Sequence, residues 1–327
     1  MRIHRRSHHF GALDKRFILK MAFKKQDYLH LETLPSMTLT KDQLLTMVDK
    51  VPAFPQSVAK ILTLTADADC SPKQLISVIE HDPILTLKVL KLVNSSYFGL
   101  SREVVSVNHA AVYVGINTIK NLAISVAASG TLPKLNQAGL DMNDFWLHSL
   151  TVGVIARSLA QQKSVPQTDL ANYFVAGLLH DIGRVLFAHF HPQQYAPVIQ
   201  AFDNELSGST PLHEIELQQL GIEHSQLGGL LAQKWELPQA LVDCISYHHK
   251  LEQCQQASDL VIAIACANRL CEYYQRSKKV SVSNRGDIEL PNFSQIELSW
   301  MQLRPEQAIE TLATLGEELS KAKAFIN

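Results

Sequence analysis

Residues 170–184 read LANYFVAGLLHDIGR. The apolar residues of this stretch recur at helical spacing, at Leu170, Phe174 and Leu178. The apolar run ends at the dipeptide His180-Asp181, and Gly183 follows as a candidate helix terminator. Polar residues at the end of an apolar helix are placed where side chains from several helices of a bundle converge. The segment therefore predicts a helical bundle with chemically active side chains gathered near helix ends.

Helical patterning continues on both sides of this segment. Ser71 with Gln74, and Thr40 with Gln43, have the spacing of capping boxes, and Asp82-Pro83 has the form of a helix start. The one strand-like stretch, 104–107, is too short to found a sheet. We therefore expect an all-α fold of two packed helical subdomains.

Four parts are expected along the chain. They are a basic arm over residues 1–38, a helical subdomain over 40–130, a second helical subdomain over 144–275, and a C-terminal loop and helix over 277–327. Turn-forming residues between Thr131 and Asn143 are typical of a linker between the two subdomains. The arm is either disordered or a basic amphipathic helix, and both interpretations stay open.

Composition narrows the function classes. The 327 residues are 46% hydrophobic and 19% charged, with a net charge of −1, so the molecule as a whole has no strong field for nucleic acid or membrane. The charge is uneven, because residues 1–36 carry +5 and the rest of the chain −6. No apolar run reaches the roughly 18–20 residues that span a bilayer. The five cysteines form no CxxC pair, which favours a reducing cytoplasm.

The chain has fourteen histidines, and several lie near expected helix ends in the second subdomain. The candidate metal ligands are His148, His180, Asp181, His224, His248 and His249. Imidazoles with one carboxylate suit Zn, Fe, Mn or Ni rather than Ca. A second HD dipeptide, His81-Asp82, serves as a control, because Asp82 precedes a proline and is interpreted as a helix cap without chemistry.

The order of these ligands and their flanking sequences resemble one known family. The matching segments are VPAFP (51–55), IEHDPILT (79–86), LVNSSYFG (92–99), AGLLHDIG (176–183) and KWELP (234–238). Over about residues 45–275 the chain is similar to the HDOD branch of the HD superfamily, and more distantly to the HD-GYP cyclic dinucleotide phosphodiesterases. The resemblance implies a bacterial regulatory module whose second subdomain is an HD-like helical bundle.

One position departs from the family pattern. The resemblance implies a closing aspartate within a stretch like ADRL, where this chain has Asn268 in ANRL (267–270). An asparagine offers a neutral oxygen and no charge, which leaves Asp181 as the single carboxylate of the candidate cluster. Two divalent cations would then be poorly neutralised, so we expect one divalent transition metal (Fe, Mn, Zn or Ni) or none. Arg184 is a candidate phosphate contact; the alternative is a charge at a surface helix end.

The leading functional hypothesis is a cytoplasmic signal-transduction protein that acts as a binding module with weak or no catalysis. Its expected partners are a protein of a signalling pathway and a nucleotide or phosphate ligand. The alternative is a metal-dependent HD-type phosphohydrolase acting on cyclic dinucleotides or phosphate esters. A third hypothesis is a membrane-surface regulator working through the basic arm. The sequence carries no nucleic-acid signature, no phosphate-binding glycine loop and no GxSxG elbow.

Overall fold

The computed structural model describes residues 39–65, 71–134, 137–204, 210–279 and 289–325. The basic arm predicted for residues 1–38 lies outside these ranges. The described residues form helices and no strand, which confirms the all-α fold. The α-helices are α2 (Lys41–Lys50), α3 (Gln56–Thr65), α4 (Pro72–Glu80), α5 (Pro83–Val93), α6 (Val107–Val114), α7 (Ile116–Thr131), α8 (Met142–Gln162), α9 (Leu170–Leu179), α10 (Ile182–Phe190), α11 (Pro192–Asn204), α12 (Leu212–Leu220), α13 (His224–Lys234), α14 (Gln239–Tyr247), α15 (Asp259–Lys279), α16 (Gln295–Met301), α17 (Pro305–Glu310) and α18 (Leu315–Ala322). Short 3₁₀ turns are η3 (Leu251–Gln253), η5 (Thr311–Thr314) and η6 (Lys323–Phe325).

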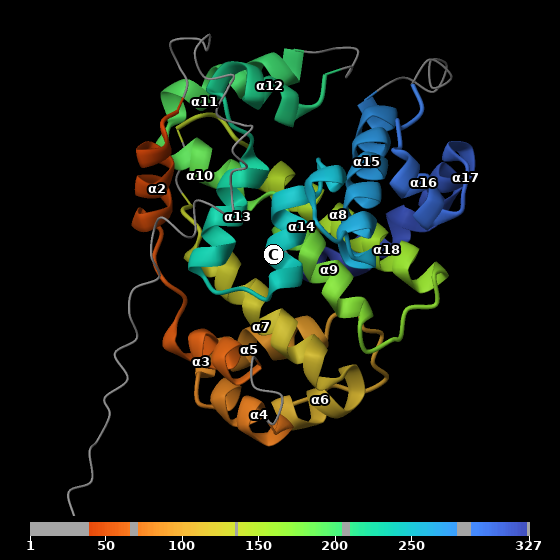
Figure 1. Cartoon of the computed structure of the whole chain (residues 1–327). Coiled ribbons are helices and arrows are strands. Elements are labelled where there is room, and N and C mark those ends of the chain that lie inside the picture. Colours follow the sequence, from red (N-terminus) through yellow and green to blue (C-terminus); the bar gives the residue numbers. More distant parts are fainter. Residues whose placement is uncertain (1–38, 66–70, 135–136, 205–209, 280–288, 326–327) are drawn as a thin grey trace, which may run out of the picture.

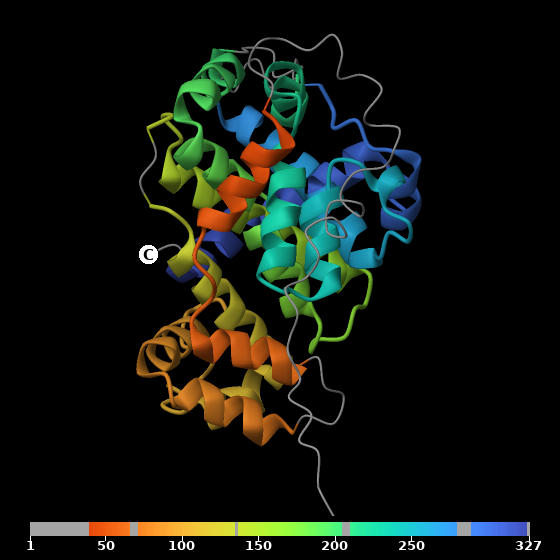
Figure 2. The ribbon, with the colours of Figure 1, turned by 60° about the vertical axis from the view of Figure 1, so that its left-hand side comes forward.

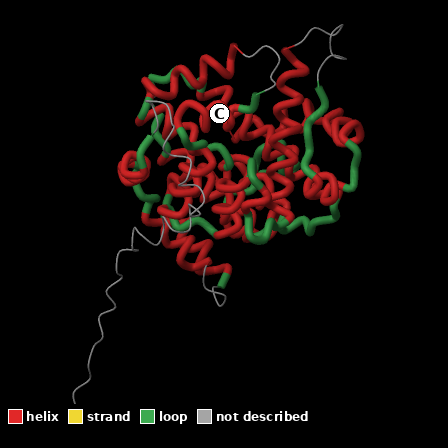
Figure 3. Tube along the Cα trace, turned by 45° about the horizontal axis from the view of Figure 1, so that its top comes forward, coloured by secondary structure: helices red, strands yellow, loops and turns green. Residues whose placement is uncertain are grey.

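The helices form two lobes of unequal size (Figures 1 and 2). The small lobe contains α3, α4, α5 and α6, and α7 runs from it into the large lobe, where it packs against α9. The large lobe contains α8 to α15, with α16 and α18 against α15 and α8. Helix α2 packs against α10 and α13 in the large lobe, although it precedes the small lobe in sequence. The tube view shows the same helical packing from above (Figure 3).

Local sequence determines how several helices begin. Thr40 and Gln43 form a capping box at α2, and Ser71 and Gln74 form one at α4, as their spacing predicts. The Asp82 carboxylate accepts hydrogen bonds from the Leu85 amide at 3.0 Å and from the Ser57 hydroxyl at 2.6 Å. The second HD dipeptide is therefore a helix cap in the small lobe, as expected.

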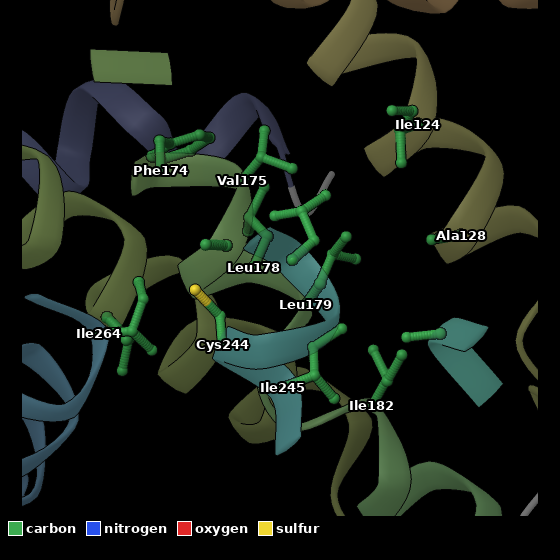
Figure 4. Close-up of a cluster of buried hydrophobic side chains, with 14 of the residues drawn as sticks. Ile124, Ala128, Phe174, Val175, Leu178, Leu179, Ile182, Cys244, Ile245 and Ile264 are labelled. Carbon is green, nitrogen blue, oxygen red and sulfur yellow. The ribbon is translucent and has the colours of Figure 1, made fainter. Parts of the chain in front are cut away.

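Helix α9 is the centre of the large lobe. It contacts α7, α8, α14 and α15, and its apolar side chains meet those of these neighbours in one core (Figure 4). Residues in this core are Ile124 and Ala128 of α7, Phe174, Val175, Leu178 and Leu179 of α9, Ile182 of α10, Cys244 and Ile245 of α14, and Ile264 of α15. The apolar run over residues 170–179 is thus a helix buried on nearly all sides, and His180-Asp181 follows its last residue.

Glycines allow the helices that hold this dipeptide to approach closely. A Cβ atom at Gly177 would overlap the backbone of Gly153, where α9 crosses α8. A Cβ atom at Gly183 would overlap the carbonyl oxygen of His224, where α10 crosses α13. The interpretation of Gly183 as a helix terminator is wrong, because α9 ends at Leu179 and Gly183 lies in the first turn of α10. Its physical role is close packing.

The C-terminal part differs in detail from the expected loop and helix. Helix α15 continues to Lys279, and α16 occupies part of the expected loop. The expected helix from about 305 is broken into α17, η5 and α18. Among the described residues, no single helix has both the length and the apolar character to cross a membrane, and α6 with α7 meets that test only as a pair bent by 117°.

Candidate metal centre

The structure brings together all six candidate ligands of the sequence. They are His148 inside α8, His180 and Asp181 between α9 and α10, His224 at the start of α13, and His248 and His249 directly after α14. His148 lies about two turns inside its helix, because α8 begins earlier than its apolar pattern indicates, at the cap Asp141. The other five occupy helix ends, which is why helices of different direction can contribute to one site.

Asp181 is the centre of this cluster. Its Oδ1 lies 3.0 Å from His224 Nε2, 3.1 Å from His180 Nε2 and 3.5 Å from His248 Nε2. Its Oδ2 lies 3.5 Å from His148 Nε2. All five residues are buried, and Asp181 is 3% exposed. Four imidazoles therefore present the same ring nitrogen to one carboxylate.

His249 extends the cluster on one side. Its Nε2 lies 3.1 Å from His224 Nε2, and its ring stacks on that of His213 with centroids 3.9 Å apart. His213 belongs to α12 and was not among the sequence candidates. No local pattern marks it, since its place beside His249 depends on how α12 packs.

The outer nitrogens of three imidazoles are held by acceptors. His180 Nδ1 and His248 Nδ1 donate to carbonyl oxygens of their own preceding turns, at 2.7 and 3.0 Å. His224 Nδ1 lies 2.6 Å from the carboxylate oxygen Oε2 of Glu216. When Nδ1 carries the proton, Nε2 of a neutral ring carries a lone pair. This is the tautomer that a metal ligand needs, with the outer partner fixing the ring.

Glu216 is a residue of the candidate site that the sequence did not indicate. It is fully buried on α12, and its Oε1 accepts a hydrogen bond from the Tyr195 hydroxyl at 2.7 Å. Its Oε2 accepts a second bond from the His224 backbone amide at 2.8 Å, besides the one to the imidazole. A glutamate eight residues before a histidine has no helical relation to it, so only the tertiary fold joins them.

Helix α15 presents a polar face to the same site. The face consists of Asn268, Cys271, Glu272 and Gln275, which share one side of the helix. Cys271 Sγ lies 3.4 Å from His148 Nδ1, and Asn268 Nδ2 donates to Glu272 Oε1 at 3.1 Å. Among the described residues, Asp181 is the one carboxylate in the two groups of close ligand atoms, and Glu216 and Glu272 lie outside those groups. Glu272 could have been found in the sequence, because it stands four residues after Asn268.

Burial and neighbouring charges shift the pKa values of the cluster. Burial opposes ionisation of Asp181, but the adjacent imidazoles of His180 and His224 outweigh it and hold the Asp181 pKa well below its ordinary value. Burial also opposes charge on His224, yet Glu216 and Asp181 raise its pKa to about 10. Burial lowers the pKa of His180 to about 3 and that of His148 to about 4. Near neutral pH Asp181 is thus anionic and the rings of His180 and His148 are neutral, and a cation at the cluster would replace the proton that His224 carries on Nε2.

The cluster opens into a cavity of about 450 Å³. Its wall includes both apolar and polar side chains; the apolar ones are Phe145, Leu147, Ile199, Phe202 and Leu212, and the polar ones include His148, Asp181, Arg184, Asn268 and Lys278. Arg184 Nη1 lies 3.0 Å from Asp181 Oδ2, and its guanidinium lies 6.0 Å from the ring centroid of Phe145. Arg184 is therefore a half-buried cation beside the cluster, and the alternative of a charge at a surface helix end is wrong.

The residues present fit a divalent transition ion. Within the described part of the chain, His248 Nε2 is buried and has no hydrogen-bond partner, and it lies 3.5 Å from Asp181 Oδ1. An unpaired buried polar atom is costly, and a cation beside Asp181 would satisfy it. The ligand atoms of Asp181, His224, His248 and His249 lie within 4.8 Å of one another, as do those of His148, His180 and Asp181. The His/Asp cluster could therefore bind a metal, and its donors are those of Zn, Fe, Mn or Ni.

Comparison with known proteins agrees with this architecture. In sequence, an uncharacterized protein of Treponema pallidum (strain Nichols) is 25% identical over 267 residues, which are 81% of this chain and 49% of that protein. This chain thus spans about half the length of that relative. A solved structure from Shewanella amazonensis SB2B, named as a candidate phosphohydrolase, is 25% identical with a TM-score of 0.65 and covers 86% of this chain and 98% of its own.

A second solved structure, an HDOD domain protein from Geobacter sulfurreducens, has the same fold. It is 21% identical with a TM-score of 0.64, over 87% of this chain and 98% of its own. The profile of the HDOD domain matches residues 51–251, which is more than half of the chain and includes the cluster from His148 to His249. The resemblance inferred from the sequence is confirmed, and this chain belongs to the HDOD domain family.

Proposed function

We propose that this HDOD protein is a regulatory binding module. Its His/Asp cluster holds one divalent transition ion, and the cavity beside it recognises a small phosphate-bearing ligand with slow turnover or none. The occupied module then signals to a protein partner. The observation that carries the proposal is the convergence of four imidazole Nε2 atoms on Asp181, which itself lines a cavity together with His148 and His224.

The charges around Asp181 favour one ion over two. Two-metal phosphohydrolase sites hold their ions about 3.5–4 Å apart between bridging and flanking ligands. Here Oδ2 of Asp181 is already 3.0 Å from the guanidinium of Arg184, so a second cation on that oxygen would face a like charge. Asn268 contributes a dipole where the family pattern has a carboxylate. Asp181 would hold the single ion together with imidazoles of the two close groups that share it, which are His148 and His180 in one and His224, His248 and His249 in the other. The ion would supply a Lewis acid for a phosphoryl oxygen.

The cavity wall supports a phosphate-bearing ligand. Arg184 and Lys278 line it, and both are cations that bind phosphate oxygens. Phe145 and Leu147 also line the cavity, and these apolar side chains suit a base or another flat apolar group. A volume of about 450 Å³ is in the range of small-molecule sites. A nucleotide-sized ligand fits these requirements.

The second candidate function is a metal-dependent phosphohydrolase. It is favoured by the set of inward Nε2 atoms and by the similarity, at 25% identity, to a structure named as a candidate phosphohydrolase. The two functions differ in turnover. A binding module keeps its ligand intact, whereas a hydrolase activates water on the ion.

Metal content and turnover, measured on the same samples, test the proposal. Purified native protein, His180→Ala and His81→Ala would be loaded in turn with Mn²⁺, Fe²⁺ and Ni²⁺. Each sample is then assayed for bound metal and for hydrolysis of cyclic dinucleotides and phosphate esters. His81→Ala is the matched control, because it removes a histidine from the other HD dipeptide, which caps a helix in the small lobe. We expect about one metal per chain in the native protein and the control, little in His180→Ala, and slow or no hydrolysis in all three.

Two results would contradict this proposal. Native protein without bound metal would exclude the cluster as a metal centre. Rapid native turnover that disappears in His180→Ala and persists in His81→Ala would make the protein an enzyme.

A further inference from the structure

The orientation of the Asn268 amide is fixed by its neighbour. The Asn268 side chain lies 3.1 Å from Glu272 Oε1, one turn further along α15. A carboxylate only accepts hydrogen bonds, so the nitrogen of the amide must face Glu272. The amide oxygen therefore faces away from Glu272. Asn268 is 4% exposed, and within the described part of the chain its Oδ1 is buried without a hydrogen-bond partner.

Asn268 and Glu272 line the same cavity as Asp181 and His148. An unpaired, buried amide oxygen at a site rich in imidazole nitrogens is a natural neutral ligand for a cation. Glu272 does not belong to either close group of ligand atoms, and its contact within the site is the hydrogen bond from the Asn268 amide. Its carboxylate would therefore act on the cation through the amide that it holds.

The two residues also suit each other in charge. An aspartate at position 268 would set its carboxylate against that of Glu272 at hydrogen-bond distance. Two carboxylates that close cannot both ionise readily. An asparagine at 268 removes this repulsion and gives Glu272 a donor. The family pattern has a negative charge at position 268, and in this chain a negative charge stands one helical turn later, at Glu272. A neutral side chain at position 268 allows Glu272 to keep that charge.

We propose that Glu272 is a positioning residue of the metal centre, which aims the Asn268 Oδ1 at the cation and supplies the missing negative charge one turn from its expected place. This inference rests on the proposed single-metal function and names a residue of that site. Glu272 would then add a negative charge near the ion to that of Asp181, which is already paired with Arg184. Asn268 would therefore still be a ligand, with a neutral oxygen in place of the carboxylate and with Glu272 as the partner that orients it.

The test separates charge from structure with matched variants. Glu272→Gln keeps the shape and can still accept from Asn268, but it removes the charge. The double variant with Asn268→Asp and Glu272→Gln returns one carboxylate to the position of the family pattern. Glu297→Gln is the control, because Glu297 is also buried and bonded to α15, through Arg269 at 2.8 Å, but is outside the cavity wall. Zn²⁺ affinity is measured by competition with a chromophoric chelator, and the metal-free melting temperature is measured for every variant.

The expected pattern is specific. Glu272→Gln should weaken Zn²⁺ binding by ~10-fold or more, in the range of outer-partner effects on metal sites, without lowering the metal-free melting temperature. The double variant should bind Zn²⁺ with an affinity within about threefold of native, which is a small difference compared with the roughly tenfold loss expected for Glu272→Gln. Glu297→Gln should lower the melting temperature and leave Zn²⁺ affinity unchanged.

Several outcomes would overturn the inference. They are native Zn²⁺ affinity in Glu272→Gln, a double variant as weak as Glu272→Gln, or losses of affinity that simply follow the melting temperature across all variants. If the native chain binds no Zn²⁺, Mn²⁺ or Fe²⁺, the proposed function fails together with this inference. If the native chain binds metal and Glu272→Gln is unaffected, this inference fails alone.

Discussion

Replacing Glu216 by glutamine removes one buried negative charge from behind His224 and keeps a side chain of the same shape. Glu216 accepts three hydrogen bonds, from the Tyr195 hydroxyl at 2.7 Å, from the His224 amide at 2.8 Å and from His224 Nδ1 at 2.6 Å. A glutamine can turn its oxygen toward His224 and donate its amide to Tyr195, whose hydroxyl hydrogen rotates to suit. The three contacts therefore survive, and the charge alone is lost.

The magnitudes follow from these contacts. Glu216→Ala would leave three buried donors without an acceptor, at ~1–3 kcal/mol each, which approaches the ~5–15 kcal/mol that stabilises a typical domain. Glu216→Gln replaces charge-assisted bonds by neutral ones and should cost only ~1–2 kcal/mol of folding free energy. Its larger effect is expected on metal binding. A carboxylate on the outer nitrogen of a ligand histidine is typically worth ~10–100-fold in metal affinity.

The assay is Zn²⁺ competition on the native protein, Glu216→Gln and Tyr195→Phe. Tyr195→Phe removes one of the hydrogen bonds to Glu216 but leaves the charge in place, so its Zn²⁺ affinity should stay within about threefold of native, well inside the outer-partner range. Native affinity in Glu216→Gln, or an equal loss in Tyr195→Phe, would refute the argument that this charge tunes His224.

Two further substitutions test the scaffold. Ser57→Ala removes the 2.6 Å hydrogen bond that is the largest cause of the lowered Asp82 pKa. A carboxyl group with a lowered pKa stabilises the fold at high pH, and this contribution is lost as pH falls through the folded-state pKa. In urea unfolding the variant should therefore be ~1 kcal/mol less stable than the native protein at pH 7, and the difference should shrink below about pH 4. A difference that does not change with pH would contradict this. Gly183→Ala should destabilise the fold by ~1–3 kcal/mol, because the new Cβ would overlap the His224 carbonyl oxygen. Replacing an exposed helical glycine by alanine normally stabilises a helix by ~1 kcal/mol, so the expected sign is the reverse of the usual one. A stabilised variant in the same unfolding assay would show that α10 and α13 can move apart.

Local sequence was enough to predict the helices, because the signals for helix starts are short-range. The capping boxes at Thr40 and Ser71 and the cap at Asp82 form as their spacing predicts. Helix ends were less predictable. Glycine is a common helix terminator, but Gly183 lies where the backbones of α10 and α13 meet and a side chain would not fit. Only the tertiary structure shows this contact.

The sequence predicted those residues of the candidate site that follow one another in the order of the family's ligand pattern. His148, His180, Asp181, His224, His248 and His249 lie together, and their role as metal ligands stays a proposal. The partners that hold them, Glu216 and His213, come from α12, and nothing in the sequence links that helix to the cluster. Glu272 was within reach, since an i, i+4 relation to Asn268 is visible in sequence, but its importance depends on the amide orientation.

The fold itself anchors the ligand residues of the cluster. His180 and His248 are anchored to carbonyl oxygens of their own helices, and Gly177 and Gly183 bring those helices into backbone contact within a large apolar core. A small zinc domain, by contrast, has too little core to fold before the metal binds. When the ligand positions are fixed in advance, metal affinity depends mainly on the charge that surrounds them. Glu216 behind His224 and Glu272 behind Asn268 are therefore the residues through which this member of the family would adjust which ion it holds, and how tightly.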